Sequence, residues 1–369
     1  MATTNYPTNH PLAVKLWAKT TFVQALRETY FYKFMSKGKN GLITFQDETK
    51  KSAGDRVTVG LRMQLDGDGI QGDNTLEGNE EAIVKYTDNL LIDQLRHATR
   101  SGGEMSQQRT LDDMRMDNKD SLKDWWADRI DTCMFNQLAG NTAVSDTRRT
   151  GNNATLAPSA NNHLWIDSDI ATGDESIGTT DTFNTAMIDR MKTRAETMED
   201  QTTSQPNIRP FTIMGQKKYV LFLHPYQAHS LRREATANTV TWWEVNRSGL
   251  SGGIPEAAKA LYEGSMGEYN NVIIHVSQRV PQGVNSSTGV AISTVRRAIF
   301  CGAQAAMFGL GRKTDLPSPE KMTWREEEFD YGNQLGVAAG CIFGIKKARF
   351  NSADFGVIVG SSYATNPTA

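Results

Sequence analysis

The sequence has few cysteines and no excess of basic residues. Its 369 residues include three cysteines, Cys133, Cys301 and Cys341, and none belongs to a C-x-x-C pair. Zinc sites and disulfide frameworks need closer spacing, so we interpret the three as small buried side chains of a protein in a reducing compartment. Lys and Arg number 40 and Asp and Glu number 42, which gives a formal net charge of −2. This balance is not that of a protein that holds nucleic acid by counterion release.

Long apolar runs are also missing. The longest near-apolar stretch, residues 335–345, is too short to span a bilayer. The first residues carry no charged segment followed by an apolar one, so we expect no secretory signal, no membrane partner and a location in the cytosol. Hydrophobic residues make up 38% of the chain, which is enough for a sizeable core.

No catalytic constellation emerges from the sequence. His224 and His229 are five residues apart, so they do not share a helical face as the zinc-binding H-E-x-x-H motif requires. We expect each to be a capping or core-edge histidine. The acidic run at residues 325–330 (REEEFD) fits a strand, in which neighbouring side chains alternate between faces. The sequence therefore predicts no enzyme activity, no cofactor and no resident metal.

Residues 65–78 (LDGDGIQGDNTLEG) match two functional motifs at once. Gly67, Gly69 and Gly72 spell G-x-G-x-x-G, which in a nicotinamide-dependent oxidoreductase joins a buried parallel strand to a helix. Here the preceding strand pattern alternates, and the six acidic residues between positions 63 and 84 would repel a pyrophosphate. A cytosolic nucleotide-binding oxidoreductase is therefore kept as an alternative, which a nicotinamide titration would test.

The same stretch also resembles a calcium-binding loop, with Asp66, Asp68 and Glu77 at positions 1, 3 and 12. However, Ile70 stands at position 5, where an oxygen donor is needed, and Gln71 at position 6, where the sharp turn needs glycine. A calcium-binding module is the second alternative, and a chelator-sensitive melting temperature would reveal it. We prefer a third interpretation, an acidic, glycine-rich tip of a long β-hairpin.

Hydrophobic periodicity predicts long helices and a hairpin in the first part of the chain. Apolar residues at helical spacing predict helices at residues 12–35 and 110–138, the second about 42 Å long at 1.5 Å per residue. Strict alternation between residues 42 and 65 predicts strands, and residues 82–100 supply the return strand, although their second half also fits a helix. Because a lone hairpin is marginally stable, we expect its apolar stripe to lie on another copy of the chain.

The middle of the chain has a different composition. Residues 141–182 are rich in Asn, Thr, Ser and Gly and predict a long surface excursion. A buried strand at residues 219–223 precedes a helix with Pro225 in its first turn. Three further helices are expected, at residues 183–198, 240–245 and 255–261. Strand and turn patterns then fill the last third, so the predicted class is α+β.

Five stretches carry a resemblance to a known family. They are GDRVTVGLRMQLDGDGIQGDNTLEGNEE (54–81), IDQLRHATRSGG (92–103), VLFLHPYQAHSLR (220–232), GSMGEYNNVIIHVSQRVP (264–281) and REEEFDYGNQLGVAAGCIFGIKKARFN (325–351). In these stretches the sequence resembles the major capsid proteins of tailed bacteriophages, specifically the N-four-like podophage family, which has the Hong Kong ninety-seven capsid fold. The resemblance implies an α+β fold with an N-terminal arm, an extended β-hairpin loop, a spine helix in a peripheral domain, and an axial domain.

The resemblance also implies where these parts begin and end. They are the arm at 1–41, the extended loop at 42–100, the peripheral domain at 101–234 with a surface insert near 141–182, the axial domain at 235–320, and C-terminal strands at 321–369 that return to the peripheral domain. The extended loop would reach over a neighbouring subunit. Some relatives crosslink covalently through a Lys and an Asn, but no motif here matches such a pair.

The function implied by the resemblance is that of a coat protein rather than an enzyme. Such a protein assembles with itself into hexamers and pentamers that form the icosahedral shell of the virion around phage double-stranded DNA. Assembly takes place in the cytoplasm of the bacterial host, with scaffolding, portal and decoration proteins as further candidate partners. The near-neutral charge fits this role, because a strongly basic wall would bind the DNA as it enters.

Charge is unevenly distributed over the predicted hairpin. Its shafts carry Lys50, Lys51, Arg56 and Arg62. Its tip carries six acidic residues, Asp66, Asp68, Asp73, Glu77, Glu80 and Glu81. We expect the tip to contact a basic patch on a neighbouring subunit, for which the arm offers Lys33, Lys37 and Lys39. Such peripheral charge pairs steer and register assembly more than they stabilise it.

Overall fold

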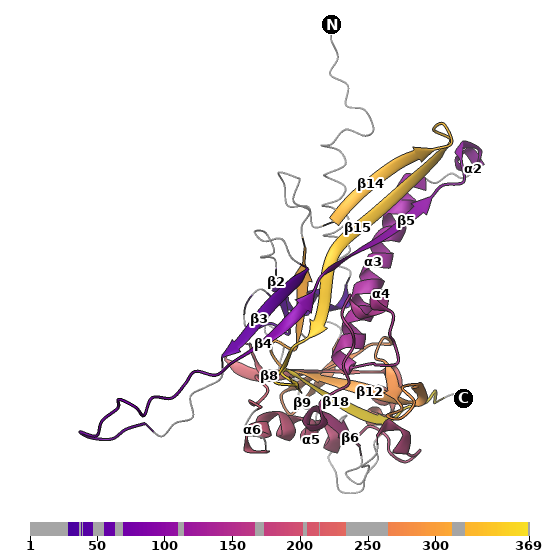
Figure 1. The fold of residues 1–369 in the computed structure, drawn as a ribbon. Coiled ribbons are helices and arrows are strands. Elements are labelled where there is room, and N and C mark those ends of the chain that lie inside the picture. The colour runs from indigo at the N-terminus through magenta and orange to yellow at the C-terminus, as the bar shows by residue number, and fades with distance from the viewer. Residues whose placement is uncertain are drawn as a thin grey trace.

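A computed structural model describes most of the chain (Figure 1). The described residues are 29–36, 38, 40–46, 55–62, 69–109, 114–166, 173–201, 205–213, 215–233, 265–311 and 322–367. They form two β-sheets, two separate strand pairs and a set of helices, which confirms the predicted α+β class. Within these ranges, no helix is long and apolar enough to cross a membrane.

The first sheet is built around the long strand β15 (Gln334–Lys347). This strand pairs antiparallel with β5 (Asp93–Arg100), β14 (Met322–Phe329) and β13 (Ala306–Leu310). Strand β13 also pairs in parallel with β2 (Ile43–Gln46), which pairs in parallel with β1 (Met35–Ser36). The sheet thus joins segments from both ends of the chain.

The second sheet carries the buried strand that the sequence predicted. Its strands, in order, are β6 (His163–Trp165), β18 (Val357–Tyr363), β12 (Ala291–Cys301), β8 (Gln216–Leu223), β10 (Val272–Val276) and β9 (Ser265–Tyr269), with β11 (Gln282–Val284) on β12 and β7 (Phe211–Ile213) on β8. Strand β8 pairs in parallel with β10, and its last six residues are all buried. A continuous apolar run suits a strand that is covered on both faces.

Helix α7 (Pro225–Arg232) follows β8 as the local signals predicted. Pro225 stands in its first turn, and the side chain of His224 caps it by accepting the N–H of Tyr226 at 3.3 Å. The prediction of a capping histidine is therefore confirmed for His224. The predicted helix at 183–198 is also confirmed, as α5 (Thr185–Glu196) followed by α6 (Met198–Gln201). The side chains of α5 form the second hydrophobic core with this sheet.

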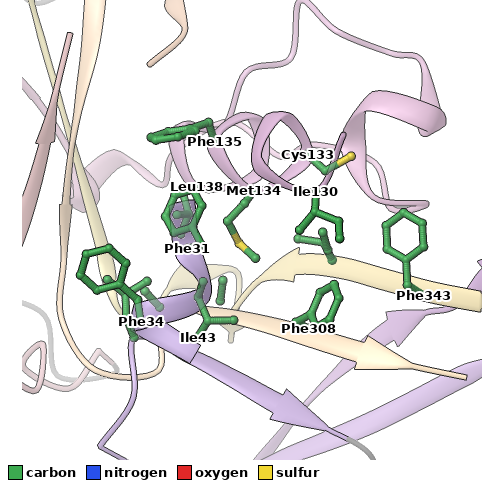
Figure 2. Packing of buried hydrophobic residues seen from close by; sticks show 14 of the residues in the cluster. Phe31, Phe34, Ile43, Ile130, Cys133, Met134, Phe135, Leu138, Phe308 and Phe343 are labelled. Carbon is green, nitrogen blue, oxygen red and sulfur yellow. The ribbon is translucent and has the colours of Figure 1, made fainter. Parts of the chain in front are cut away.

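Helix α3 (Met114–Ala139) is the predicted spine helix, preceded by the short α2 (Glu104–Arg109). Its stripe of Leu122, Trp126, Ile130, Met134 and Leu138 is buried in the first hydrophobic core. Figure 2 shows Phe31, Phe34, Ile43, Phe308 and Phe343 from other elements around the C-terminal half of this helix. The helix therefore ties the start of the described chain to the first sheet.

The predicted hairpin is formed by β3 (Arg56–Arg62) and β4 (Lys85–Leu91), which pair antiparallel. The second half of the return strand, which also fitted a helix, is strand β5. The apolar stripe of its described shaft is partly covered by the chain itself, and its contact with another copy stays a prediction. Val57, Val59 and Leu61 pack within the chain, in a cluster that includes Phe350 and Phe355 next to the short pair β16 (Arg349–Phe350) and β17 (Ala353–Asp354).

Two expectations need correction. Of the helix predicted at 12–35, residues 12–28 lie outside the described residues, and the remainder is the 3₁₀ helix η1 (Tyr30–Phe34) followed by strand β1 rather than an α-helix. The surface excursion predicted at 141–182 contains α4 (Thr147–Thr150), η2 (Ala160–Asn162), β6 and η3 (Asp174–Ser176), and many of its polar side chains are buried. The helices predicted at 240–245 and 255–261 lie outside the described residues.

Candidate subunit-contact surfaces

The hairpin is fixed to the body of the molecule by polar contacts at its root. Asp88 of β4 is 7% exposed, forms an ion pair with Lys346, and accepts the backbone N–H of Arg349 at 3.1 Å. Across the hairpin, the hydroxyl of Thr58 donates to the side chain of Asn89 at 2.8 Å. A buried carboxylate with charged and backbone partners fixes the position of a strand strongly, because an unpaired charge would be costly there.

Beyond the shaft, residues 69–84 form a long loop that we call the projecting loop. Figure 1 shows it reaching away from the body of the molecule. Residues 71–84 are all exposed, and several hydrogen bonds within the loop close local turns. For example, the N–H of Asn79 donates to the carbonyl of Leu76 at 3.0 Å, and the side chain of Asn74 donates to the carbonyl of Gln71 at 2.9 Å.

The described glycines of the projecting loop do not form a nucleotide site, and Gly67 of the predicted motif lies outside the described residues. Gly69, Gly72 and Gly78 have φ angles of 71°, 66° and 89°, in the left-handed region that favours glycine. Nothing lies within 4 Å of the position where a Cβ would stand on any of the three. Turns and strand β4 follow the motif, whereas a dinucleotide site needs a helix there to receive the pyrophosphate.

Four of the six predicted acidic contact residues lie on this loop. Asp73, Glu77, Glu80 and Glu81 are exposed, and the carboxylate of Glu80 accepts the N–H of Gly78 at 2.8 Å. Asp66 and Asp68 lie outside the described residues, as do Lys37 and Lys39 of the predicted basic partner. In the part of the chain that the structure describes, no group of three His, Cys, Asp or Glu side chains is placed to hold a metal.

Lys33, the third predicted basic residue, is half-buried in η1. Its ammonium lies 4.9 Å from the ring centre of Tyr30 and 5.3 Å from that of Phe34. Cation–π contacts of this kind stabilise the charge where it is. Lys33 therefore belongs to the packing around the spine helix as well as to the candidate basic patch.

Sequence reasoning missed the apolar residues of the projecting loop. Leu76, Ile83 and Val84 are 61%, 57% and 49% exposed. Large aliphatic side chains held in water on a protruding loop are typical of a protein contact surface. The available signal was the interruption of the acidic stretch DNTLEGNEEAIV by these three residues.

A second candidate contact surface lies where β14 turns into β15, next to α2 (Figure 1). Tyr331 at this turn is fully exposed and has a φ of 54°, which is strained for an aromatic residue. Met105 and Met116, on α2 and at the start of α3, are 62% and 48% exposed. The side chain of Asn333 joins the turn to α2 by accepting the N–H of Glu104 at 3.2 Å.

The chain matches a known family. The sequence profile of the phage capsid proteins matches residues 5–366. The chain belongs to this family. It is 29% identical to the major capsid protein of Pseudomonas phage KPP25 over 379 aligned positions, which cover 93% of each chain.

Solved capsid structures have the same architecture. The capsid of Ralstonia phage GP4 superposes with a TM-score of 0.78 and 32% identity over 92% of each chain. The capsid of cyanophage Pam1 has the same fold, with a TM-score of 0.68, 18% identity, and coverage of 92% of this chain and 93% of the other. The protein is thus a phage major capsid protein, a coat protein that assembles with itself into the shell of the virion. The oxidoreductase and calcium-binding alternatives find no support.

Among the described residues, a pocket of about 360 Å³ is lined by both apolar and polar side chains, which include His163, Trp165, Asp174 and Arg297. The carboxylate of Asp174 in this wall is held by the side chains of Arg297, Trp165 and His163 and by the N–H of Val284. Burial raises the pKa of Asp174, but the hydrogen bond from His163 and the charge of Arg297 outweigh it and hold the pKa well below its usual range. A carboxylate with every oxygen engaged is not free to act as a base.

Proposed function

We propose that this capsid protein forms rings of six and of five copies, which close into an icosahedral shell around double-stranded DNA, and that the projecting loop links neighbouring copies. The observation that carries this proposal is the loop itself. It extends away from the body with residues 71–84 exposed, and it presents Leu76, Ile83 and Val84 to water. Contact with another copy would bury these side chains, which is favourable at about 25 cal/mol per Å².

Charge supplies the orientation of this contact. The acids of the tip, Asp66, Asp68, Asp73, Glu77, Glu80 and Glu81, face a basic patch of the neighbouring copy, with Lys33, Lys37 and Lys39 as its candidates. Because peripheral charges act over about 10 Å at 0.1 M salt, they guide the approach of subunits before the apolar contacts form. The arrangement predicts assembly that slows as salt is added.

The finer assignments follow the resemblance to the N-four-like podophage capsid proteins. In this proposal the arm covers residues 1–41, the extended loop 42–100, the peripheral domain 101–234, the axial domain 235–320, and the returning strands 321–369. Assembly takes place in the bacterial cytoplasm with scaffolding, portal and decoration proteins as further partners. The net charge of −2 supports a shell wall that encloses DNA without binding it tightly.

Electron microscopy of the purified protein, with light scattering on the same sample, tests the proposal. We expect closed shells, capsomer rings or tubes, with six- and five-fold rings visible in class averages. If the protein stays monomeric even when co-expressed with the scaffolding protein of its phage, the proposal that it forms such rings is wrong.

The role of the tip is tested by neutralising its described acids together, as Asp73→Asn, Glu77→Gln, Glu80→Gln and Glu81→Gln. We expect slower assembly and a weaker dependence of the rate on salt. The matched control neutralises three exposed acids of α3, as Asp117→Asn, Asp120→Asn and Asp124→Asn. Equal rates and equal salt dependence in the two variants would refute the proposed charge contact.

A further inference from the structure

The hairpin leaves the first sheet at a defined point. The ladder between β5 and β15 runs from Arg100 opposite Gly336 to Asp93 opposite Phe343. Two residues further, the same register would place Leu91 opposite Ile345. Instead, Leu91 belongs to β4 and pairs with Arg56 of the hairpin. The stretch that joins β4 to β5 therefore separates from β15 at residues 91–93. We call this point of separation the fork.

The side chain of Asn153 fills the place of the missing pair. Its Oδ1 accepts the N–H of Leu91 at 3.0 Å, and its Nδ2 donates to the carbonyl of Leu91 at 2.9 Å. The same Nδ2 lies 3.2 Å from the carbonyl oxygen of Ile345 on the other arm of the fork. A side-chain amide offers a donor and an acceptor like a peptide group, so it can satisfy backbone groups that lose their strand partner.

Gly151 and Asn152 also bond to the strands at the fork, and we call residues 151–153 the wedge. The Nδ2 of Asn152 donates to the carbonyls of Asp93 at 3.2 Å and Phe343 at 2.8 Å, at the last pair of the ladder. The N–H of Ile345 donates to the carbonyl of Gly151 at 2.9 Å. Asn152 and Asn153 are 9% and 8% exposed, so an unpaired backbone group here would be costly.

The spine helix α3 holds the wedge in place through hydrogen bonds. Gln137 of α3 is fully buried, and its Nε2 donates to the carbonyls of Thr150 at 2.6 Å and Asn153 at 2.9 Å. On β15, Gly344 leaves room for the end of β4 to pass close by. A Cβ on Gly344 would collide with the carbonyl of Leu91. Direct hydrogen bonds thus link Gln137 of α3 to Asn153, and Asn153 to Leu91 at the fork.

We propose that Asn153 positions the projecting loop, by fixing the point and the direction in which the hairpin leaves the first sheet. At this point one continuous stretch of chain passes from β4 to β5, which have different partners, and Asn152 and Asn153 bond backbone groups on both sides of it. The direction of the hairpin decides where its tip meets a neighbouring copy, so this inference rests on the proposed role of the loop in assembly.

A distance measurement on the unassembled full-length protein tests the positioning role. Thr75→Cys on the loop and Ser121→Cys on α3 are both exposed sites for spin labels, and the native cysteines are buried. Pulsed electron–electron double resonance then reports the distribution of distances between the two spin labels. We expect a narrow distribution in the parent and a broad one in the Asn153→Ala variant, with about tenfold faster amide exchange at Leu91 and in β3.

The matched control is Gln227→Ala. Gln227 is a fully buried amide in α7 whose Nε2 donates to the carbonyl of Arg296 at 3.0 Å and to the hydroxyl of Ser362 at 2.9 Å. Loss of the Gln227 amide should destabilise the second sheet but leave the distribution of loop-to-helix distances narrow. If Asn153→Ala gives a distribution as narrow as that of Gln227→Ala, the positioning role is refuted.

A second variant of nearly unchanged size, Asn153→Asp, guards against simple misfolding. At pH 8 its carboxylate would face the carbonyls of Leu91 and Ile345 without a proton to donate, so we expect a broad distribution. Burial beside two carbonyl oxygens should raise the pKa of this carboxyl, so we expect protonation at pH 5 to restore a donor and the distribution to narrow. A narrow distribution at both pH values would overturn the inference. Normal shells from a variant with a broad distribution would support the positioning role and count against the role of the loop in assembly.

Discussion

The carboxylate of Asp174 lies 2.8 Å from the guanidinium of Arg297, and the two side chains are 0% and 5% exposed. Asp174 lies in the stretch that composition marked as a surface excursion, and Arg297 lies in β12 of the second sheet. Arg297 also donates to the carbonyl of Gly140 at 2.9 Å, just after α3 ends. One ion pair therefore joins the spine helix, the second sheet and the segment between them.

Removing one charge of this pair should destabilise the fold. Asp174→Asn keeps the shape of the side chain but leaves the guanidinium of Arg297 buried without its counter-charge. We expect the free energy of unfolding to fall by about 3–5 kcal/mol, measured by urea denaturation of the unassembled protein. Glu175→Gln changes the exposed neighbouring carboxylate and should cost under about 0.5 kcal/mol. Equal losses in the two variants would contradict this account.

The same pair predicts a sensitivity to acid. The pKa of Asp174 is lowered in the folded protein, so its contribution to stability is fully present above the usual carboxylate pKa of about 4 and is lost as the pH falls below it. Denaturation at a series of pH values should show the difference between the parent and Asp174→Asn shrinking below about pH 4. A difference that stays constant down to pH 2 would argue against the ion pair.

Asp131 should act in the opposite direction. Its carboxylate accepts the N–H groups of Tyr30 at 2.9 Å and Phe31 at 3.4 Å and lies 3.8 Å from Arg279. Burial raises the pKa of Asp131 to about 6, although these N–H groups and Arg279 lower it in part. The folded protein thus binds this proton more tightly than the unfolded chain does, so stability from Asp131 is lost as the pH rises from about 4 to about 6, by up to about 3 kcal/mol.

Asp131→Asn removes this titration and should flatten the change in stability over that pH range. Urea denaturation at half-unit steps between pH 4 and pH 7 measures the effect. Asp128→Asn serves as the control, because Asp128 is an exposed carboxylate one turn away that also pairs with Arg279. The assignment to Asp131 would be wrong if Asp128→Asn removed the slope and Asp131→Asn preserved it.

Polar replacement of the loop aliphatics should separate folding from assembly. In the triple variant Leu76→Ser, Ile83→Ser and Val84→Ser, the unfolding free energy should change by less than about 0.5 kcal/mol per site, because these side chains are exposed in the single chain. The yield of shells, followed by light scattering, should drop strongly. Val290→Ser alters an aliphatic side chain of similar exposure, 63%, on the turn between β11 and β12. An equal drop for Val290→Ser would show that the effect is not specific to the loop.

Two glycines of the sheets should respond differently to alanine. A Cβ on Gly344 would meet the backbone carbonyl of Leu91, whereas a Cβ on Gly360 would meet the terminal methyl group of Met191. A methionine side chain can rotate away, but a backbone carbonyl moves only with its strand. We expect Gly344→Ala to cost at least about 2 kcal/mol and Gly360→Ala clearly less, as measured by thermal unfolding. The reverse order would contradict the close crossing at Gly344.

Local signals predicted much of the fold. The apolar run of β8, the proline and histidine at the start of α7 and the stripe of α3 all lie within short windows, so their structure follows from neighbours in the sequence. The hairpin and its exposed acidic tip were also predictable, because strict alternation fixes which side chains share a face. The tip partners remain a prediction, since Asp66, Asp68, Lys37 and Lys39 lie outside the described residues and the contact involves a second copy.

The stretch at 141–182 shows why other features could not be predicted. Asn, Thr and Gly favour turns, and composition alone places turns at the surface. Asn152 and Asn153 are buried because their amides bond to backbone groups of Asp93, Phe343, Leu91 and Ile345, which are roughly 60 or 190 positions away in sequence. No short window of sequence contains both halves of such a contact.

The 26-residue helix α3 has a mechanical consequence for the shell. At 1.5 Å per residue it is about 39 Å long, and it cannot stretch or shorten without breaking consecutive hydrogen bonds. Copies that tilt differently across a curved wall should therefore keep this helix unchanged and adjust at the contacts between copies. The stiffness of such a wall would come from the helices, and its tolerance of different curvatures from the contacts between copies.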